Sequence, residues 1–149
     1  MNKGKSSTLL ILLIVLLAVL SMASCQKGSS DKTYADGKYT GRSLDHNDDE
    51  SGNGAGYGIV ELEIKDGALV SCEFRLYKLD GTLKDETYGS DLSQANRLKA
   101  QKAVQSAAKY AQALVSAGTG SKVEVISGAT ISHSEFTEAV NDALSKAAR

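Results

Sequence analysis

Apolar and polar residues alternate along two neighbouring segments of the chain. In residues 58–64, valine, leucine and isoleucine occupy even positions and glutamates two of the odd ones, a period of two that indicates a half-buried strand. The next alternating segment, residues 70–76, places its larger apolar side chains on one face: Val70, Cys72, Phe74 and Leu76. Between them lies Asp66-Gly67, a dipeptide that favours a tight hairpin turn. A β-hairpin is therefore predicted.

Two other segments have apolar residues at three- and four-residue spacing, which predicts amphipathic helices. From Asp91 to Ala117 the chain lacks glycine and is rich in alanine; Asp91 is suited to cap this helix and Gly118 to end it. Its predicted inner side consists of Leu92, Ala95, Leu98, Ala107, Ala111, Leu114 and Val115. A last helix is predicted from about Ser134, with Phe136, Val140, Ala143, Leu144 and Ala147 on its inner side.

The start of the last helix carries two further signals. Ser132 and Glu135 have the spacing of a capping box, and Ile131 and Phe136 that of a hydrophobic staple. Short strands are expected near residues 36–41 and at residues 123–126. The order strand, hairpin, helix, strand, helix predicts an α+β domain, a small and mainly antiparallel sheet with helices packed on one face.

The N-terminal residues have the layout of a secretory signal. Lysines precede an apolar run, Leu9 to Leu20, whose 12 residues are fewer than the roughly 20 that cross a membrane. Met22 to Cys25 resembles the lipobox of bacterial lipoproteins, although Ser21 to Ala23 would also suit ordinary signal peptidase. We expect a signal peptide at 1–24, a lipidated Cys25, a polar tether at 25–33 and one domain at 34–149, anchored to membrane lipid on the extracytoplasmic side.

Charge and cysteine content exclude several classes of function. Without residues 1–24 the chain has 15 Lys and Arg against 18 Asp and Glu, a formal net charge of −3, so no nucleic-acid partner is expected. Once Cys25 carries lipid, Cys72 has no cysteine to pair with and is interpreted as a small buried apolar residue. The spacing of Cys, His and acidic residues predicts no metal site.

The segment Ser127-Gly128-Ala129-Thr130 lies between the predicted short strand and the last helix. Gly128 permits a tight or left-handed backbone path. Unpaired amide groups and the positive end of the helix dipole gather at such a junction, and both favour an anion such as phosphate. Junctions of this kind are also common without any ligand, so the residues by themselves indicate only a site suited to an anion.

Residues Val125 to Ser132 resemble the Ser-Gly-Ala-Thr signature of the FMN-binding domain family. The likeness extends to Asp36–Gly41, to the hairpin and to the helix containing Ala139–Leu144. This family includes flavin-bearing subunits of the sodium-pumping NADH:quinone reductase and of Rnf complexes, and small lipoproteins of extracellular electron transfer. In its flavinylated members a flavin transferase uses FAD to join FMN phosphate to the final threonine of the signature.

The resemblance implies that Thr130 carries FMN as a phosphoester, with Ser127, Gly128, Ala129 and Ser132 as neighbouring cofactor-binding residues. It further implies a membrane-anchored electron carrier rather than a stand-alone enzyme, with a flavin transferase and redox donor and acceptor proteins as partners. Four residues are candidates for stacking on or contact with the flavin ring: Tyr57, Tyr77, Tyr88 and His133. Each of them is also compatible with a packing or surface role. Glu124 stands where the family usually has Asp. The alternatives are noncovalent FMN, or a surface binding or adhesion lipoprotein of this fold without flavin.

Overall fold

The computed structural model describes residues 34–47, 54–119 and 122–149. The predicted signal peptide (1–24), the proposed lipidation site Cys25 and the tether (25–33) lie outside this part of the chain. Among the described residues, no helix has the length and apolar character needed to cross a membrane.

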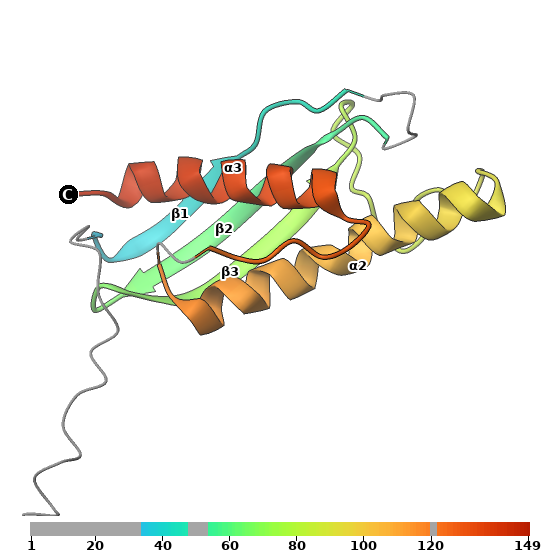
Figure 1. The fold of residues 1–149 in the computed structure, drawn as a ribbon. Coiled ribbons are helices and arrows are strands. Elements are labelled where there is room, and N and C mark those ends of the chain that lie inside the picture. The colour runs from blue at the N-terminus through green and yellow to red at the C-terminus, as the bar shows by residue number, and fades with distance from the viewer. Residues whose placement is uncertain (1–33, 48–53, 120–121) are drawn as a thin grey trace, which may run out of the picture. The chain divides into compact units, whose positions relative to one another are not determined.

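The sheet consists of three antiparallel strands in the order β1-β2-β3: β1 (Gly37–Arg42), β2 (Tyr57–Lys65) and β3 (Ala68–Tyr77) (Figure 1). Asp66 and Gly67 connect β2 to β3 with φ angles of 53° and 72°. Positive values at both central residues are what a type I′ turn requires. The predicted hairpin and its turn are thus confirmed.

Asp36, directly before β1, fastens this turn to the rest of the sheet. Its carboxylate accepts hydrogen bonds from the amides of Asp66 and Gly67, each at 3.0 Å. These two bonds hold the pKa of Asp36 below its ordinary value, because hydrogen bonds to the charged form favour that form.

The predicted inner face of β3 is wrong at one residue. The pairing shifts near the turn, so that Glu63 faces Ser71 but Ile64 faces Leu69. The extra residue of this β-bulge is Val70, which is 47% exposed, whereas Leu69 is 7% exposed and joins the core. A bulge inserts one residue and reverses the alternation beyond it, so Leu69 takes the inward position assigned to Val70.

Helices α2 (Gln94–Ala117) and α3 (Thr130–Ala147) cover one face of the sheet (Figure 1). Helix α3 packs on β1 and β2, and α2 packs on β3. This arrangement is the predicted α+β architecture. All five apolar residues expected on the inner side of α3 are buried. Gly41 of β1 allows the close approach of α3, since a Cβ there would lie 2.0 Å from the carbonyl oxygen of Ala139.

The predicted inner side of α2 holds only for its second half. Ala107, Ala111 and Leu114 are buried, but Leu98 is 67% exposed. Figure 1 shows why: the first turns of α2 extend past the sheet, where no strand lies beneath them. Leu92, expected on the same inner side, precedes the helix and is half-exposed.

The caps of α2 also differ in part from expectation. The N-cap is Ser93, whose side chain accepts a hydrogen bond from the amide of Asn96. Asp91 instead lies in the preceding turn, where the amide of Leu92 bonds to the carbonyl of Gly89 at 3.1 Å. Gly118 ends the helix with a φ of 87°, as expected for a C-terminal glycine.

Candidate functional site

The Ser-Gly-Ala-Thr segment forms a turn that leads directly into α3. The amide of Ala129 bonds to the carbonyl of Ile126 at 2.9 Å, and Gly128 has a φ of 76°, so the left-handed path expected for this glycine is confirmed. The helix begins at Thr130 rather than near Ser134. Thr130 is exposed on the first turn.

Because the helix begins earlier than predicted, the capping box is wrong. Ser132 and Glu135 lie within α3 and are 3% and 2% exposed. The N-cap is Ala129, and the structure shows no side-chain cap bond to it among the residues it describes. The side chain of Ser132, predicted as the cap, therefore does not accept a hydrogen bond from the amides of the first turn.

Residues 123–126, where a short strand was predicted, have no regular structure. Within the described part of the chain, the backbone of this segment forms hydrogen bonds with side chains and not with a neighbouring strand. His133 Nε2 lies 2.7 Å from the carbonyl oxygen of Val123, and Tyr110 bonds to the amide of Ile126. His133, for which the sequence left a surface role open, is thus a partly buried structural residue that fixes the segment before the turn.

Tyr110 of α2 is the residue that sequence reasoning missed. It is fully buried, and its hydroxyl donates to the carbonyl of Ala129 and accepts from the amide of Ile126, each at 3.0 Å. Its ring stacks on Phe136 at 5.5 Å and meets His133 edge-on at 5.4 Å. The only signal in the sequence is a single large polar aromatic within the alanine-rich stripe of α2. Tyr110 fixes both ends of the turn that carries Gly128.

Replacing Tyr110 by Phe should lower the free energy of unfolding by about 1–3 kcal/mol, because it leaves a buried carbonyl and a partly buried amide without their partner. Urea denaturation followed by circular dichroism measures this loss. Tyr57→Phe is the matched control, since Tyr57 lies on the helix-free face of the sheet, and it should change stability by less than about 0.5 kcal/mol. Equal values for the two variants would show that the Tyr110 hydroxyl does not hold the turn.

Thr130 and its neighbours line a cavity of about 1230 Å³. Its wall comes from three parts of the chain: the residues before β2, the segment from the end of β3 into α2, and the start of α3. Gly128, Ala129, Thr130 and Ser132 line it, whereas Ser127 is exposed and does not. Four of the five predicted cofactor-binding residues are therefore brought to one cavity.

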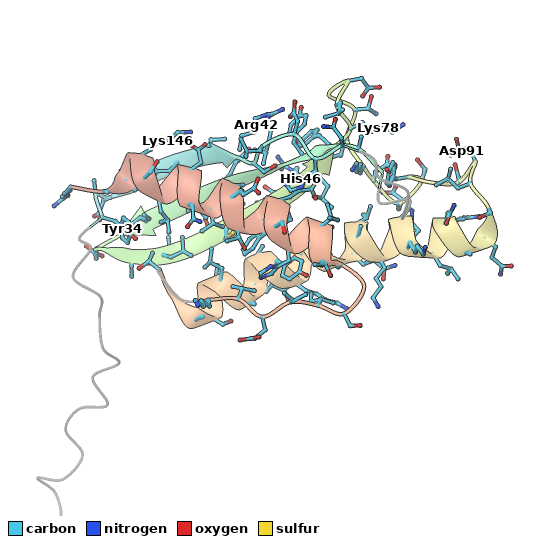
Figure 2. The ribbon with its side chains drawn as sticks, turned by 45° about the horizontal axis from the view of Figure 1, so that its top comes forward. Tyr34, Arg42, His46, Lys78, Asp91 and Lys146 are labelled. Atoms are coloured by element: carbon cyan, nitrogen blue, oxygen red, sulfur yellow. The ribbon has the colours of Figure 1, made fainter. Side chains whose placement is uncertain are left out.

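One wall of the cavity is apolar and carries side chains that are unusually exposed. Leu79, Leu83 and Leu92 are 45–46% exposed and line the cavity beside Leu76, which is buried. The three leucines come from residues 78–93, between β3 and α2; Figure 2 labels Lys78 at the start of this segment and Asp91 near its end. A ligand with an apolar surface would cover them.

The three tyrosines considered for the ring separate into two groups. Tyr88 lines the cavity. Tyr57 and Tyr77 do not: their rings stack on one another at 5.5 Å, and the guanidinium of Arg42 lies 3.8 Å from the centroid of Tyr57. Since these two occupy positions that alternate with the buried residues of β2 and β3, they belong to the face of the sheet opposite the helices.

Positive charge lies next to the turn. A Cβ on Gly128 would be 2.9 Å from the Nζ atom of Lys102 of α2, so the ammonium group passes close to this glycine. Lys99, one turn earlier on α2, lines the cavity. Together with the positive end of the α3 dipole, these lysines favour an anion beside Thr130.

Cys72 is partly buried and has no disulfide. Burial, with a smaller contribution from the charge of Glu73, raises the pKa of its thiol to about 12. A thiol with so high a pKa is almost entirely protonated near neutral pH and is a poor nucleophile. The structure also shows no group of three or more His, Cys, Asp or Glu residues arranged for a metal within the described residues.

Comparisons with known proteins agree with this geometry. Residues 33–145 match the model of a family described as the FMN-binding domain. The crystal structure of the CPE2226 protein from Clostridium perfringens has a similar fold, with a TM-score of 0.56 at 19% identity, over 76% of this chain and 88% of that one. The comparison with curated proteins gives no match.

Proposed function

Since this chain belongs to the FMN-binding domain family and is a flavin-binding protein with FMN as cofactor, we propose that the FMN phosphate is esterified to the Oγ1 atom of Thr130. We further propose that the protein is a lipid-anchored electron carrier on the outer side of the membrane. The observation that carries the first proposal is the position of Thr130, exposed on the first turn of α3 and on the wall of the cavity.

The phosphate end of the cofactor fits the turn. Unpaired amides and the dipole at the start of a helix bind phosphate, and the ammonium of Lys102 passes beside Gly128. Gly128 has no side chain to hinder this approach, and any substitution would also be strained at a φ of 76°. The turn that Tyr110 holds therefore offers the phosphate a fixed site.

The ring end of the cofactor fits the remaining cavity. Ligand sites of about 300–1,000 Å³ suffice for drug-sized molecules, and this cavity, at about 1230 Å³, exceeds that range. The exposed leucines of the apolar wall supply surface that a planar ring would bury. Tyr88 lies in the same wall and is suited to contact an aromatic ring.

Attachment would follow the chemistry of the family. Thr130 Oγ1 forms a bond to the flavin-side phosphorus of FAD, the phosphoanhydride bond breaks, AMP leaves, and the hydroxyl proton is released. This transfer needs a flavin transferase as partner. Glu124, the acidic residue before the turn, is exposed and accessible to such an enzyme.

Bound FMN would supply reversible electron transfer, and the residues of this chain would orient and tune it. A carrier must give its partners access to the cofactor, and the half-exposed leucines at the cavity wall suit contact with both cofactor and partner. We therefore propose electron transfer between redox proteins rather than catalysis by this chain alone.

The proposed location rests on the sequence before the domain. The apolar run and the lipobox-like Met22–Cys25 support export and lipidation. A covalent bond suits this location, because a flavin that dissociates outside the cell is lost by dilution. Anchor, tether and ester bond together would keep the cofactor at the membrane.

Expression with and without a flavin transferase tests the proposal. We expect yellow protein only with the transferase, and the colour should remain after denaturation and desalting, because the phosphoester survives unfolding. Colour that is lost on denaturation would indicate noncovalent FMN. A colourless protein in both cases would support a surface lipoprotein of this fold that does not retain flavin.

A further inference from the structure

Glu135 of α3 is a buried carboxyl group on the wall of the cavity. The residue is 2% exposed and lines the cavity, and its Oε1 atom has no hydrogen-bond partner among the described residues. An unpaired buried polar atom costs about 1–3 kcal/mol, and folded proteins contain few of them. A partner from outside the chain would remove this cost.

Charged side chains from three elements act on Glu135. Burial is the main influence and raises its pKa; the charges of Lys84 and His46 oppose this, and that of Glu138 adds to it. Lys84, from the segment after β3, is 6% exposed; its ammonium donates to the carbonyl of Gly54 at 3.1 Å. His46, beside α3 in Figure 2, lies 3.2 Å from Glu138. The other charged residues lining the cavity are Lys78, Asp80, Asp85, Asp91 and Lys99.

The position of Glu135 suits the far end of a ligand that begins at Thr130. The two residues are five positions apart on α3, about 7.5 Å along the helix axis at 1.5 Å per residue, and both line the cavity. The ribityl chain of FMN separates its phosphate from its ring by a comparable distance. With the phosphate at Thr130, a cofactor that extends along α3 would bring polar atoms of its ring toward Glu135.

We infer that Glu135 is a cofactor-contacting residue whose Oε1 atom forms a hydrogen bond with a polar atom of the isoalloxazine ring and whose ionisation adds to the pH dependence that the FMN reduction potential has by itself. This inference rests on the proposed function only in placing FMN in the cavity. A neutral carboxyl group donates a hydrogen bond to the ring. An ionised one places a negative charge beside it and disfavours the added electrons.

The protein without flavin gives the first measurement. Because the folded protein holds the proton of Glu135 to a higher pH than the unfolded chain does, this group stabilises the fold below its unfolded pKa. That contribution is lost as pH rises through the folded pKa. The free energy of unfolding of wild type should fall relative to that of Glu135→Gln as pH rises above the ordinary pKa of a glutamate, because the folded-state pKa is raised. A constant difference would contradict a buried, titrating Glu135.

The flavin-loaded protein gives the second measurement, which a purely structural role would not change. The midpoint potentials of wild type and Glu135→Gln should agree at acid pH and diverge as pH rises, with wild type the lower. We expect the ratio of affinities for reduced and oxidised cofactor to change about tenfold, or about 30 mV for a two-electron couple. Glu86→Gln is the matched control: Glu86 is exposed and does not line the cavity, so this variant should follow wild type.

The outcomes separate the inference from the proposed function. If denaturation releases the flavin from all three proteins, covalent attachment fails, and the same potentials measured on the noncovalent FMN complex still decide the role of Glu135. Potentials of Glu135→Gln that match wild type at every pH would overturn the inference and leave a water molecule as the partner of Oε1. Failure of the native wild type to bind FMN would overturn both.

Discussion

Replacing Thr130 by Ala should abolish covalent flavinylation completely. The Oγ1 atom is the only part of the side chain that can form the phosphoester, so no slower route remains at this position. Thr130→Ser keeps the hydroxyl on the exposed first turn of α3 and should retain most of the label. In-gel flavin fluorescence after denaturing electrophoresis, from cells that also express a flavin transferase, measures both variants.

The control for this experiment is stability. Thr130 is exposed, so its replacement by Ala should change the free energy of unfolding by less than about 0.5 kcal/mol. Loss of label without loss of fold would locate the attachment site. A Thr130→Ala protein that stays fluorescent would show that FMN is joined elsewhere.

Replacing Cys25 by Ser should move the protein from the membrane fraction to the soluble fraction. Each buried CH₂ group of an acyl chain contributes about 0.8 kcal/mol to membrane binding, and stable anchoring takes two membrane-binding groups, such as two acyl chains. Without the thiol of Cys25 the lipid cannot be attached. Cell fractionation followed by immunoblotting measures the shift. The expected result is a nearly complete loss from the membrane fraction.

Cys72→Ser is the matched control, because it removes the other cysteine of the chain. Cys72 is partly buried in β3 and its thiol is unreactive, so its loss should leave the distribution unchanged. A Cys25→Ser protein that remains in the membrane fraction would show that something other than lipid on Cys25 anchors it.

Local sequence patterns predicted correctly the elements that are determined by residues close together in the sequence. The hairpin follows from alternation and from Asp66-Gly67, which adopts the two positive φ angles. The inner side of α3 follows from the spacing of Phe136 and the small residues around it. In each case propensity and burial favour the same structure.

The structure differs from the sequence-based predictions where contacts between residues distant in the sequence determine the local conformation. Val70 is exposed because pairing with β2 creates a bulge, and alternation within β3 alone cannot reveal this. Glu135 does not serve as a capping residue, because α3 begins at Thr130 and turns this side chain toward the cavity, near Lys84. The side-chain bonds from Tyr110 and His133 replace the predicted strand at 123–126.

The candidate site shows the same division. Gly128 and Thr130 could be identified from a short motif at a predicted helix start, and the structure places both on the cavity wall. Tyr88, another candidate from the sequence, also lines the cavity. Most of the remaining wall could not be predicted, because it comes from α2 and from the segment after β3. Lys102 lies beside Gly128, 26 residues further along the chain, only because α2 packs near the start of α3.

Above all, we propose that FMN is joined to Thr130 and occupies the cavity beside α3. Tandem mass spectrometry of proteolytic peptides from the flavinylated protein tests it most directly. We expect a peptide containing Thr130 that is heavier by one FMN less one water, with fragment ions that place the added mass on Thr130. An unmodified Thr130 peptide, or the added mass on another residue, would contradict it.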